Sequence, residues 1–157
     1  MSLITKILPT GNVFLDLDVG SKKRVFEQVG IVFENSHGIA RSVIFDSLFA
    51  REKLGSTGLG QGVAIPHGRI KGLKEATGAF VRLSTPIPFD APDGKPVSLI
   101  FVLLVPANAT DLHLQILSEL AQLFSDKQLR EELNTLAEPH LVWQRIANWQ
   151  PYGVDFS

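Results

Sequence analysis

The apolar run at residues 97–105 constrains the fold of this chain more than any other feature. It reads VSLIFVLLV and is almost uninterrupted by polar residues. A strand with one face exposed to solvent alternates between polar and apolar residues, so a continuous apolar run predicts a central strand covered on both faces. The run is also far short of the roughly 20 apolar residues that a membrane helix needs. We therefore predict an α/β (α+β) fold, a single domain in which helices pack on both sides of a mixed sheet.

Periodicity places the remaining elements around this strand. Alternating polarity at 13–17 predicts another strand, and shorter apolar segments predict strands at 63–65 and 78–83. Helical spacing predicts two helices in the first half of the chain, one capped by Ser21 that ends near residues 35–38 and one from about Ala40 to Lys53. It predicts three more in the second half. The first begins near Thr110 or Asp111, the second carries Leu129, Leu133 and Leu136, and the last has Pro139 in its first turn.

Two segments are expected to lie outside this framework. Residues 84–97 read STPIPFDAPDGKPV, and the prolines and the Asp-Gly pair predict a surface loop. Residues 151–157 are predicted to form a C-terminal tail, which leaves 1–150 as one domain.

The bulk composition excludes several classes of function. The chain has 157 residues, with 15 basic and 16 acidic side chains and a net charge of -1, so nothing favours nucleic acid or an anionic membrane. It has no cysteine, which excludes disulfides, thiol catalysis and thiolate metal sites. No leader or membrane segment is recognisable, so no membrane insertion is predicted and the cytoplasm is the expected location.

The segment 51–69, REKLGSTGLGQGVAIPHGR, is the most distinctive part of the chain. Pro66 and Gly68 restrict the backbone around His67 and present its imidazole for chemistry. The glycines match neither GxxxxGK[ST] nor GxGxxG, which argues against a nucleotide site. They are equally consistent with close backbone packing under any function.

The four histidines differ in their surroundings. His37 and His140 are interpreted as solvated residues at helix ends. His113 lies in the first turn of a predicted helix, on the face that continues as Leu117 and Leu120. It is therefore either a partly buried, hydrogen-bonded histidine or a neutral imidazole at the positive end of a helix, where an anion is favoured.

Metal binding and serine hydrolysis both fit poorly. Two histidines are too few ligands, no HExxH spacing occurs, and Arg69 beside His67 would repel a cation. Arg69 itself is interpreted as a solvated charge on the rim. Ser56 is not in a GxSxG elbow.

A nucleophilic histidine remains. Neutral imidazole attacks phosphorus through one nitrogen while the other donates to a carbonyl or carboxylate. Phosphoryl transfer then requires mainly that the reacting atoms are aligned and that hydrogen-bond donors contact the phosphoryl oxygens. Arg51 and His113 are the predicted donors, with support for the phosphate from Ser56, Thr57 and Gly58.

Three segments in order resemble a known family: REKLGSTGLGQGVAIPHGR, TPIPFDAPDGKPVSLIFVLLVP and DLHLQILSELAQLF. They are similar to the enzyme IIA domain of the bacterial phosphotransferase system, of the fructose/mannitol class and within it the nitrogen-regulatory type. The resemblance is clear over about residues 35–150 and fainter before them.

The resemblance implies a phosphotransferase with a phosphohistidine intermediate. It implies phosphorylation of His67 on Nε2, a second active-site histidine at His113 and a phosphate contact from Arg51. It also implies a histidine-containing phosphocarrier protein as donor, a IIB domain or a regulated target protein as the next partner, and neither nucleotide nor metal cofactor.

The resemblance leaves the biological role open. Because no transporter domain is appended to this chain, we expect the regulatory role. The alternatives are a sugar-specific IIA component that passes phosphate to a IIB domain, and a non-catalytic docking module of the same fold.

Overall fold

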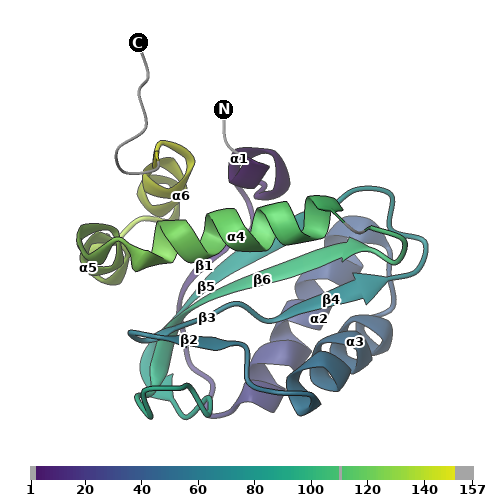
Figure 1. Cartoon of the computed structure of the whole chain (residues 1–157), viewed down its shortest axis with the longest axis horizontal. Coiled ribbons are helices and arrows are strands. Elements are labelled where there is room, and N and C mark those ends of the chain that lie inside the picture. The colour runs from purple at the N-terminus through teal and green to yellow at the C-terminus, as the bar shows by residue number, and fades with distance from the viewer. Residues whose placement is uncertain (1–2, 110, 151–157) are drawn as a thin grey trace.

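The computed structural model describes residues 3–109 and 111–150, and shows a mixed sheet between two layers of helices (Figure 1). The helices are α1 (Leu3–Ile7), α2 (Lys22–His37), α3 (Arg41–Lys53), α4 (Asp111–Ser125), α5 (Lys127–Thr135) and α6 (Pro139–Ala147). The strands are β1 (Val13–Leu17), β2 (Gly58–Gly60), β3 (Val63–Ala64), β4 (His67–Ile70), β5 (Thr77–Ile87) and β6 (Val97–Pro106). The predicted tail at 151–157 and Thr110 lie outside the described residues.

The sheet has the order β1-β5-β6-β3-β2, and β4 pairs with β6 as well. The β5–β6 and β2–β3 pairs are antiparallel, whereas β1–β5, β3–β6 and β4–β6 are parallel. This arrangement confirms the predicted mixed sheet flanked by helices, with the apolar run 97–105 near its middle.

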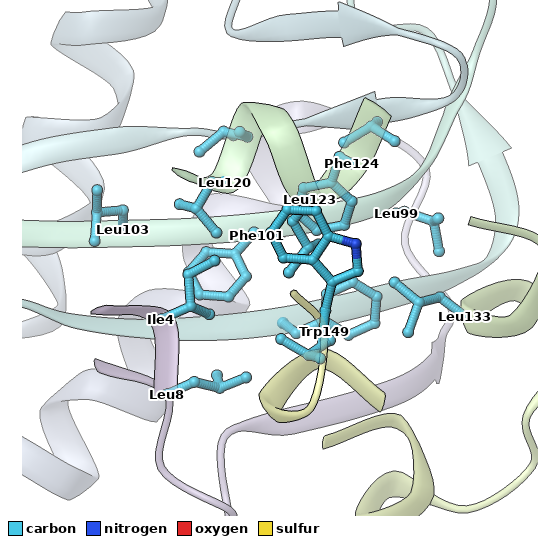
Figure 2. Packing of buried hydrophobic residues seen from close by; sticks show 14 of the residues in the cluster. Ile4, Leu8, Leu99, Phe101, Leu103, Leu120, Leu123, Phe124, Leu133 and Trp149 are labelled. Carbon is cyan, nitrogen blue, oxygen red and sulfur yellow. The ribbon is translucent and has the colours of Figure 1, made fainter. Parts of the chain in front are cut away.

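Strand β6 explains why that run is apolar throughout. Leu99, Phe101 and Leu103 enter the core beneath α1, α4, α5 and α6, where Phe124 and Trp149 also pack (Figure 2). The alternate residues Ile100 and Val102 enter a second core, which α2 and α3 cover. Both faces of the strand are therefore buried, and polar side chains there would lose hydration without compensation.

The caps of α2 follow the sequence closely. The Ser21 side chain accepts a hydrogen bond from the Arg24 backbone amide at 3.2 Å. Gly38 ends the helix in the left-handed conformation with φ 69°, which glycine adopts without strain.

The predicted surface loop at 84–97 is wrong in part. Strand β5 continues to Ile87, and the side chains of Ile87 and Phe89 are buried. Pro86 is tolerated because the pairing of β1 with β5 ends at Leu83, so this stretch has no partner on that side.

Three short elements escaped prediction. They are the five-residue helix α1, the three-residue strand β2, and β4, which begins at His67. Val63 faces Leu99 and His67 faces Leu103, so β3 and β4 keep one register along the same edge of β6. Pro66 lacks an N–H and interrupts the ladder between them.

Candidate active site

Strand β4 holds His67 at its first residue, with the imidazole half-buried. Nδ1 lies 2.9 Å from the carbonyl oxygen of Ile65. A carbonyl only accepts, so Nδ1 carries the proton and donates it, and Nε2 keeps its lone pair. Burial lowers the pKa of His67 most strongly, the hydrogen bond to Ile65 opposes this, and the charge of Arg51 lowers the pKa further. These contacts favour the neutral, nucleophilic ring.

His113 is brought to His67 by the first turn of α4. The two ring centroids are 5.4 Å apart, with the planes at 63°. Both His113 nitrogens are buried and have no hydrogen-bond partner within residues 3–109 and 111–150. Burial lowers the pKa of His113, and electrostatic interaction with His67, Arg69 and Arg51 lowers it further. Of the two interpretations of this residue, the partly buried, hydrogen-bonded histidine is not what the described residues show.

Arg51 shares a pocket of about 340 Å³ with His67. It comes from the last turn of α3, and its Nη1 donates to the Gly55 carbonyl at 2.8 Å, which restrains the guanidinium at the pocket wall. The α4 side of the pocket is formed by Leu117, Ser118 and Ala121. The positively charged guanidinium of Arg51 therefore lines the same pocket as the His67 ring, and such a pocket suits an anionic ligand.

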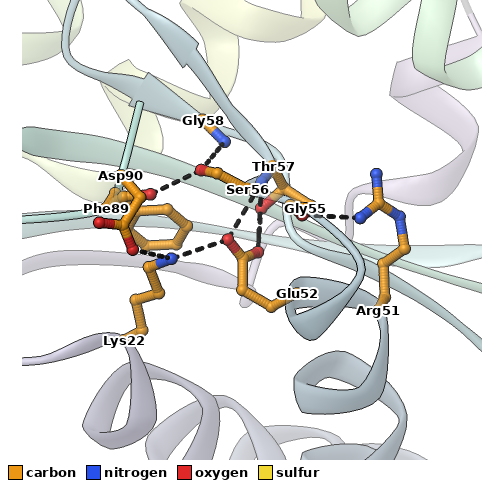
Figure 3. A network of polar contacts seen from close by, with 9 residues as sticks. All are labelled: Lys22, Arg51, Glu52, Gly55, Ser56, Thr57, Gly58, Phe89 and Asp90. Atoms are coloured by element: carbon orange, nitrogen blue, oxygen red, sulfur yellow. Dashed lines mark hydrogen bonds and ion pairs between the residues drawn. The ribbon is translucent and has the colours of Figure 1, made fainter. Parts of the chain in front are cut away.

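Ser56, Thr57 and Gly58 line the same pocket, but their polar groups already have partners in the protein. The Ser56 hydroxyl donates to the Phe89 carbonyl at 2.6 Å and accepts from the Gly58 amide at 3.0 Å. The Thr57 hydroxyl donates to Glu52 at 2.5 Å. Their support of a phosphate therefore stays a prediction. Figure 3 shows this network, including Glu52, which sequence reasoning missed.

Gly68 is needed for space beside His67 rather than for a turn. A Cβ atom there would lie 2.3 Å from the Ser47 hydroxyl oxygen, 3.2 Å from Ser47 Cβ and 3.3 Å from its carbonyl carbon. The Ser47 hydroxyl donates to the Arg69 carbonyl at 3.0 Å, so α3 and β4 are in direct contact. This contact fixes the distance between the helix that carries Arg51 and the strand that carries His67.

Replacing Gly68 with alanine is expected to lower the free energy of unfolding by about 1–3 kcal/mol, because the added methyl overpacks this contact. Chemical denaturation measures the loss. Combining the change with Ser47→Gly should restore part of it, and a Gly68→Ala protein as stable as the wild type would contradict the packing argument.

Arg69 is exposed, as expected, but it is not a free charge on the rim. Its Nη1 donates to the Ala109 carbonyl, and to the Ala107 carbonyl at 3.3 Å. It thereby links β4 to the segment that leads into α4 and His113.

The sequence predicts an exposed partner surface near residues 64–68 and on the helix that starts at Asp111. The first part is wrong, because Ala64, Ile65, Pro66 and Gly68 are buried where β3 and β4 lie in the sheet. The exposed large apolar side chains of this region are Leu112 and Leu114 on α4, together with Leu54 and Leu59.

Further features of the described residues concern the other two histidines, clusters of possible metal ligands and helix length. His37 and His140 are exposed. Residues 3–109 and 111–150 hold no cluster of three or more His, Asp or Glu side chains suited to a metal ion. Within the same ranges, no helix has the length and apolar character to cross a bilayer.

Comparison with known proteins shows which family the chain is similar to. The chain is 40% identical over 151 residues to a nitrogen regulatory protein of Pseudomonas aeruginosa, covering 96% of this chain and 98% of that protein. The crystal structure of the nitrogen regulatory protein IIA-Ntr from Neisseria meningitidis is 58% identical, with a TM-score of 0.88 over 92% of this chain and 99% of the other.

A more distant structure shares the fold alone. It is a complex of enzyme IIAMTL and phosphorylated enzyme IIBMTL from Escherichia coli, 18% identical, with a TM-score of 0.76 over 91% of this chain and all of the other. The model of the family described as "Phosphoenolpyruvate-dependent sugar phosphotransferase system, EIIA 2" matches residues 6–149. This chain therefore belongs to the EIIA 2 family of the phosphoenolpyruvate-dependent sugar phosphotransferase system.

Proposed function

We propose that this protein is a cytoplasmic phosphoryl carrier that accepts a phosphoryl group on Nε2 of His67 from a histidine-containing phosphocarrier protein. The hydrogen bond from Nδ1 to the Ile65 carbonyl, at 2.9 Å, carries the proposal. It fixes the tautomer in which Nε2 is the nucleophile, at a pocket that Arg51 also lines.

The transfer needs no added reagent. The Nε2 lone pair of His67 forms a bond to phosphorus while the bond from phosphorus to the donor nitrogen breaks and returns its electron pair to the donor ring. The Ile65 carbonyl supports the charge that develops on the His67 ring through Nδ1–H. Arg51 and His113 are the proposed donors to the phosphoryl oxygens.

We place the next step in regulation, through binding or release of a target protein. The nitrogen regulatory relatives, similar over nearly their whole length, support this role. A sugar-specific component that passes phosphate to a IIB domain is the second candidate, favoured by the sugar system named in the family description. The exposed leucines around the site, Leu54, Leu59, Leu112 and Leu114, are the proposed docking surface.

Incubation with phosphoenolpyruvate and the general phosphotransferase proteins tests the proposal. We expect one phosphoryl group per chain that is labile in acid and stable in base, as a phosphoramidate is. Absence of any such label would favour the docking module that works without transfer. Adding a fructose- or mannitol-type IIB domain separates the remaining roles, because only the sugar-specific component should lose its label rapidly.

A further inference from the structure

Glu52 is a carboxylate in an unfavourable place. It lies in the last turn of α3, and its side chain is only 4% exposed. Burial removes hydration from the charge, and the carbonyl end of a helix dipole repels an anion. A glutamate that stays there must be held by strong partners.

Three donors surround this carboxylate (Figure 3). Lys22 Nζ donates to it at 3.0 Å, the Thr57 amide at 3.1 Å and the Thr57 hydroxyl at 2.5 Å. Lys22 comes from the first turn of α2 and also pairs with Asp90 at 3.1 Å. Glu52 thus ties the segment after α3 to the ends of two helices.

The same contacts continue to the candidate nucleophile. The Thr57 carbonyl accepts from the Ile65 amide at 3.0 Å, and the Ile65 carbonyl accepts from His67 Nδ1 at 2.9 Å. Ile65 is buried and sits at the interruption between β3 and β4, where its N–H and C=O serve Thr57 and His67. The position of its carbonyl therefore depends on Thr57, and that of Thr57 on Glu52.

From these contacts we infer that Glu52 is a positioning residue for His67: through Thr57 and Ile65 it fixes the carbonyl that holds Nδ1–H and aims Nε2 into the pocket. The value of this placement for phosphoryl transfer rests on the function proposed above. Glu52 follows Arg51 directly in the chain, so the same helix end supplies the candidate phosphate-binding cation and the anchor of Thr57, which lines the same pocket.

Charge supports the assignment. The charged groups that act on His67 are Arg51 and Arg69, which lower its pKa, and Glu52, which raises it. The hydrogen bond to Ile65 raises the pKa of His67 as well. Loss of Glu52 should thus lower the pKa of His67 by both routes, through the missing charge and through a looser Ile65 carbonyl.

The test is Glu52→Gln, which keeps the size of the side chain but places an amide group against donors. We expect a folded protein in which labelling from the phosphocarrier slows about tenfold, because reacting groups displaced by a fraction of an ångström align poorly. In the unphosphorylated protein, an NMR titration should show a lower pKa for His67 and a changed Nδ1–H resonance.

Glu34→Gln is the matched control. Like Glu52, Glu34 is in an ion pair, with Arg41 at 2.7 Å, but it lies at the far end of α2 from Lys22. The Glu34→Gln substitution should leave the labelling rate and the pKa of His67 unchanged. A folded Glu52→Gln protein with a wild-type pKa and Nδ1–H signal for His67 would overturn the inference even if labelling were slower, since a general loss of stability would then explain the rate.

Thr57→Val decides the question if Glu52→Gln does not fold. It removes the hydroxyl that donates to Glu52 but keeps the amide, so the His67 pKa should fall in the same direction; no change would overturn the inference. These NMR measurements need no phosphoryl donor. A wild-type protein that is never labelled would refute the proposed function while the titration still tests Glu52.

Discussion

Replacing His67 with alanine is expected to abolish phosphoryl labelling. Nε2 of this ring is the proposed nucleophile, and the hydrogen bond from Nδ1 to the Ile65 carbonyl leaves its lone pair free. Among the described residues, no other side chain that lines the Arg51 pocket has a nitrogen lone pair fixed in this way. His113 adjoins the ring, but no backbone carbonyl within the described residues fixes its tautomer. Label incorporation from phosphoenolpyruvate, in the presence of the general phosphotransferase proteins, measures the loss.

His140→Ala is the control for this experiment. It makes the same chemical change at an exposed position in the first turn of α6, and should be labelled at the wild-type rate. Circular dichroism should show both variants folded, because the His67 side chain is only half-buried. Substantial label on the His67→Ala protein would remove His67 from its proposed role.

Arg51→Met should slow labelling by about 10- to 100-fold. Methionine keeps most of the apolar length of the side chain but removes the guanidinium, and a hydrogen bond to a charged group is worth about 1.5–3 kcal/mol. The positive charge of Arg51 also lowers the pKa of His67, so its removal should raise that pKa. Rapid-quench labelling measures the first effect, and NMR titration of the His67 ring the second.

Lys53→Met separates a specific role from a general loss of positive charge. Lys53 is exposed, two residues further along α3, and its ammonium lies 4.7 Å from the centroid of the Phe49 ring. It should have little effect on labelling. Equal rates in the two variants would show that Arg51 contributes only to the overall field.

Sequence reasoning proposed His67 and His113 as site residues from their local patterns and Arg51 as a candidate donor, and these roles stay predictions. A histidine between proline and glycine, and another on the inward face of a first helical turn, are visible as patterns. The structure adds that the rings meet, with centroids 5.4 Å apart. That distance depends on the register of β4 on β6 and on how α4 packs over the sheet, which no local pattern encodes.

Glu52 could not be found in this way. In the sequence it lies in REK, a charged triplet that is typical of the solvent-exposed end of a helix. Its burial results from Lys22, 30 residues earlier, and from the return of the chain at Thr57. Gly68 is similar, since its reason is the approach of Ser47 on α3 rather than the conformation of its own backbone. In both cases, contacts between segments that are distant in the sequence determine why the residue is needed.

The bonds from Arg69 to the carbonyls of Ala107 and Ala109 have a consequence for the speed of encounters. They hold the approach to α4 against β4 in the isolated protein, so a visiting molecule meets a surface that is already assembled. Docking then loses little chain entropy, and it needs no slow rearrangement of this segment before a complex forms. Association without rearrangement suits the phosphoryl carrier proposed above, whose donor and target must bind in turn.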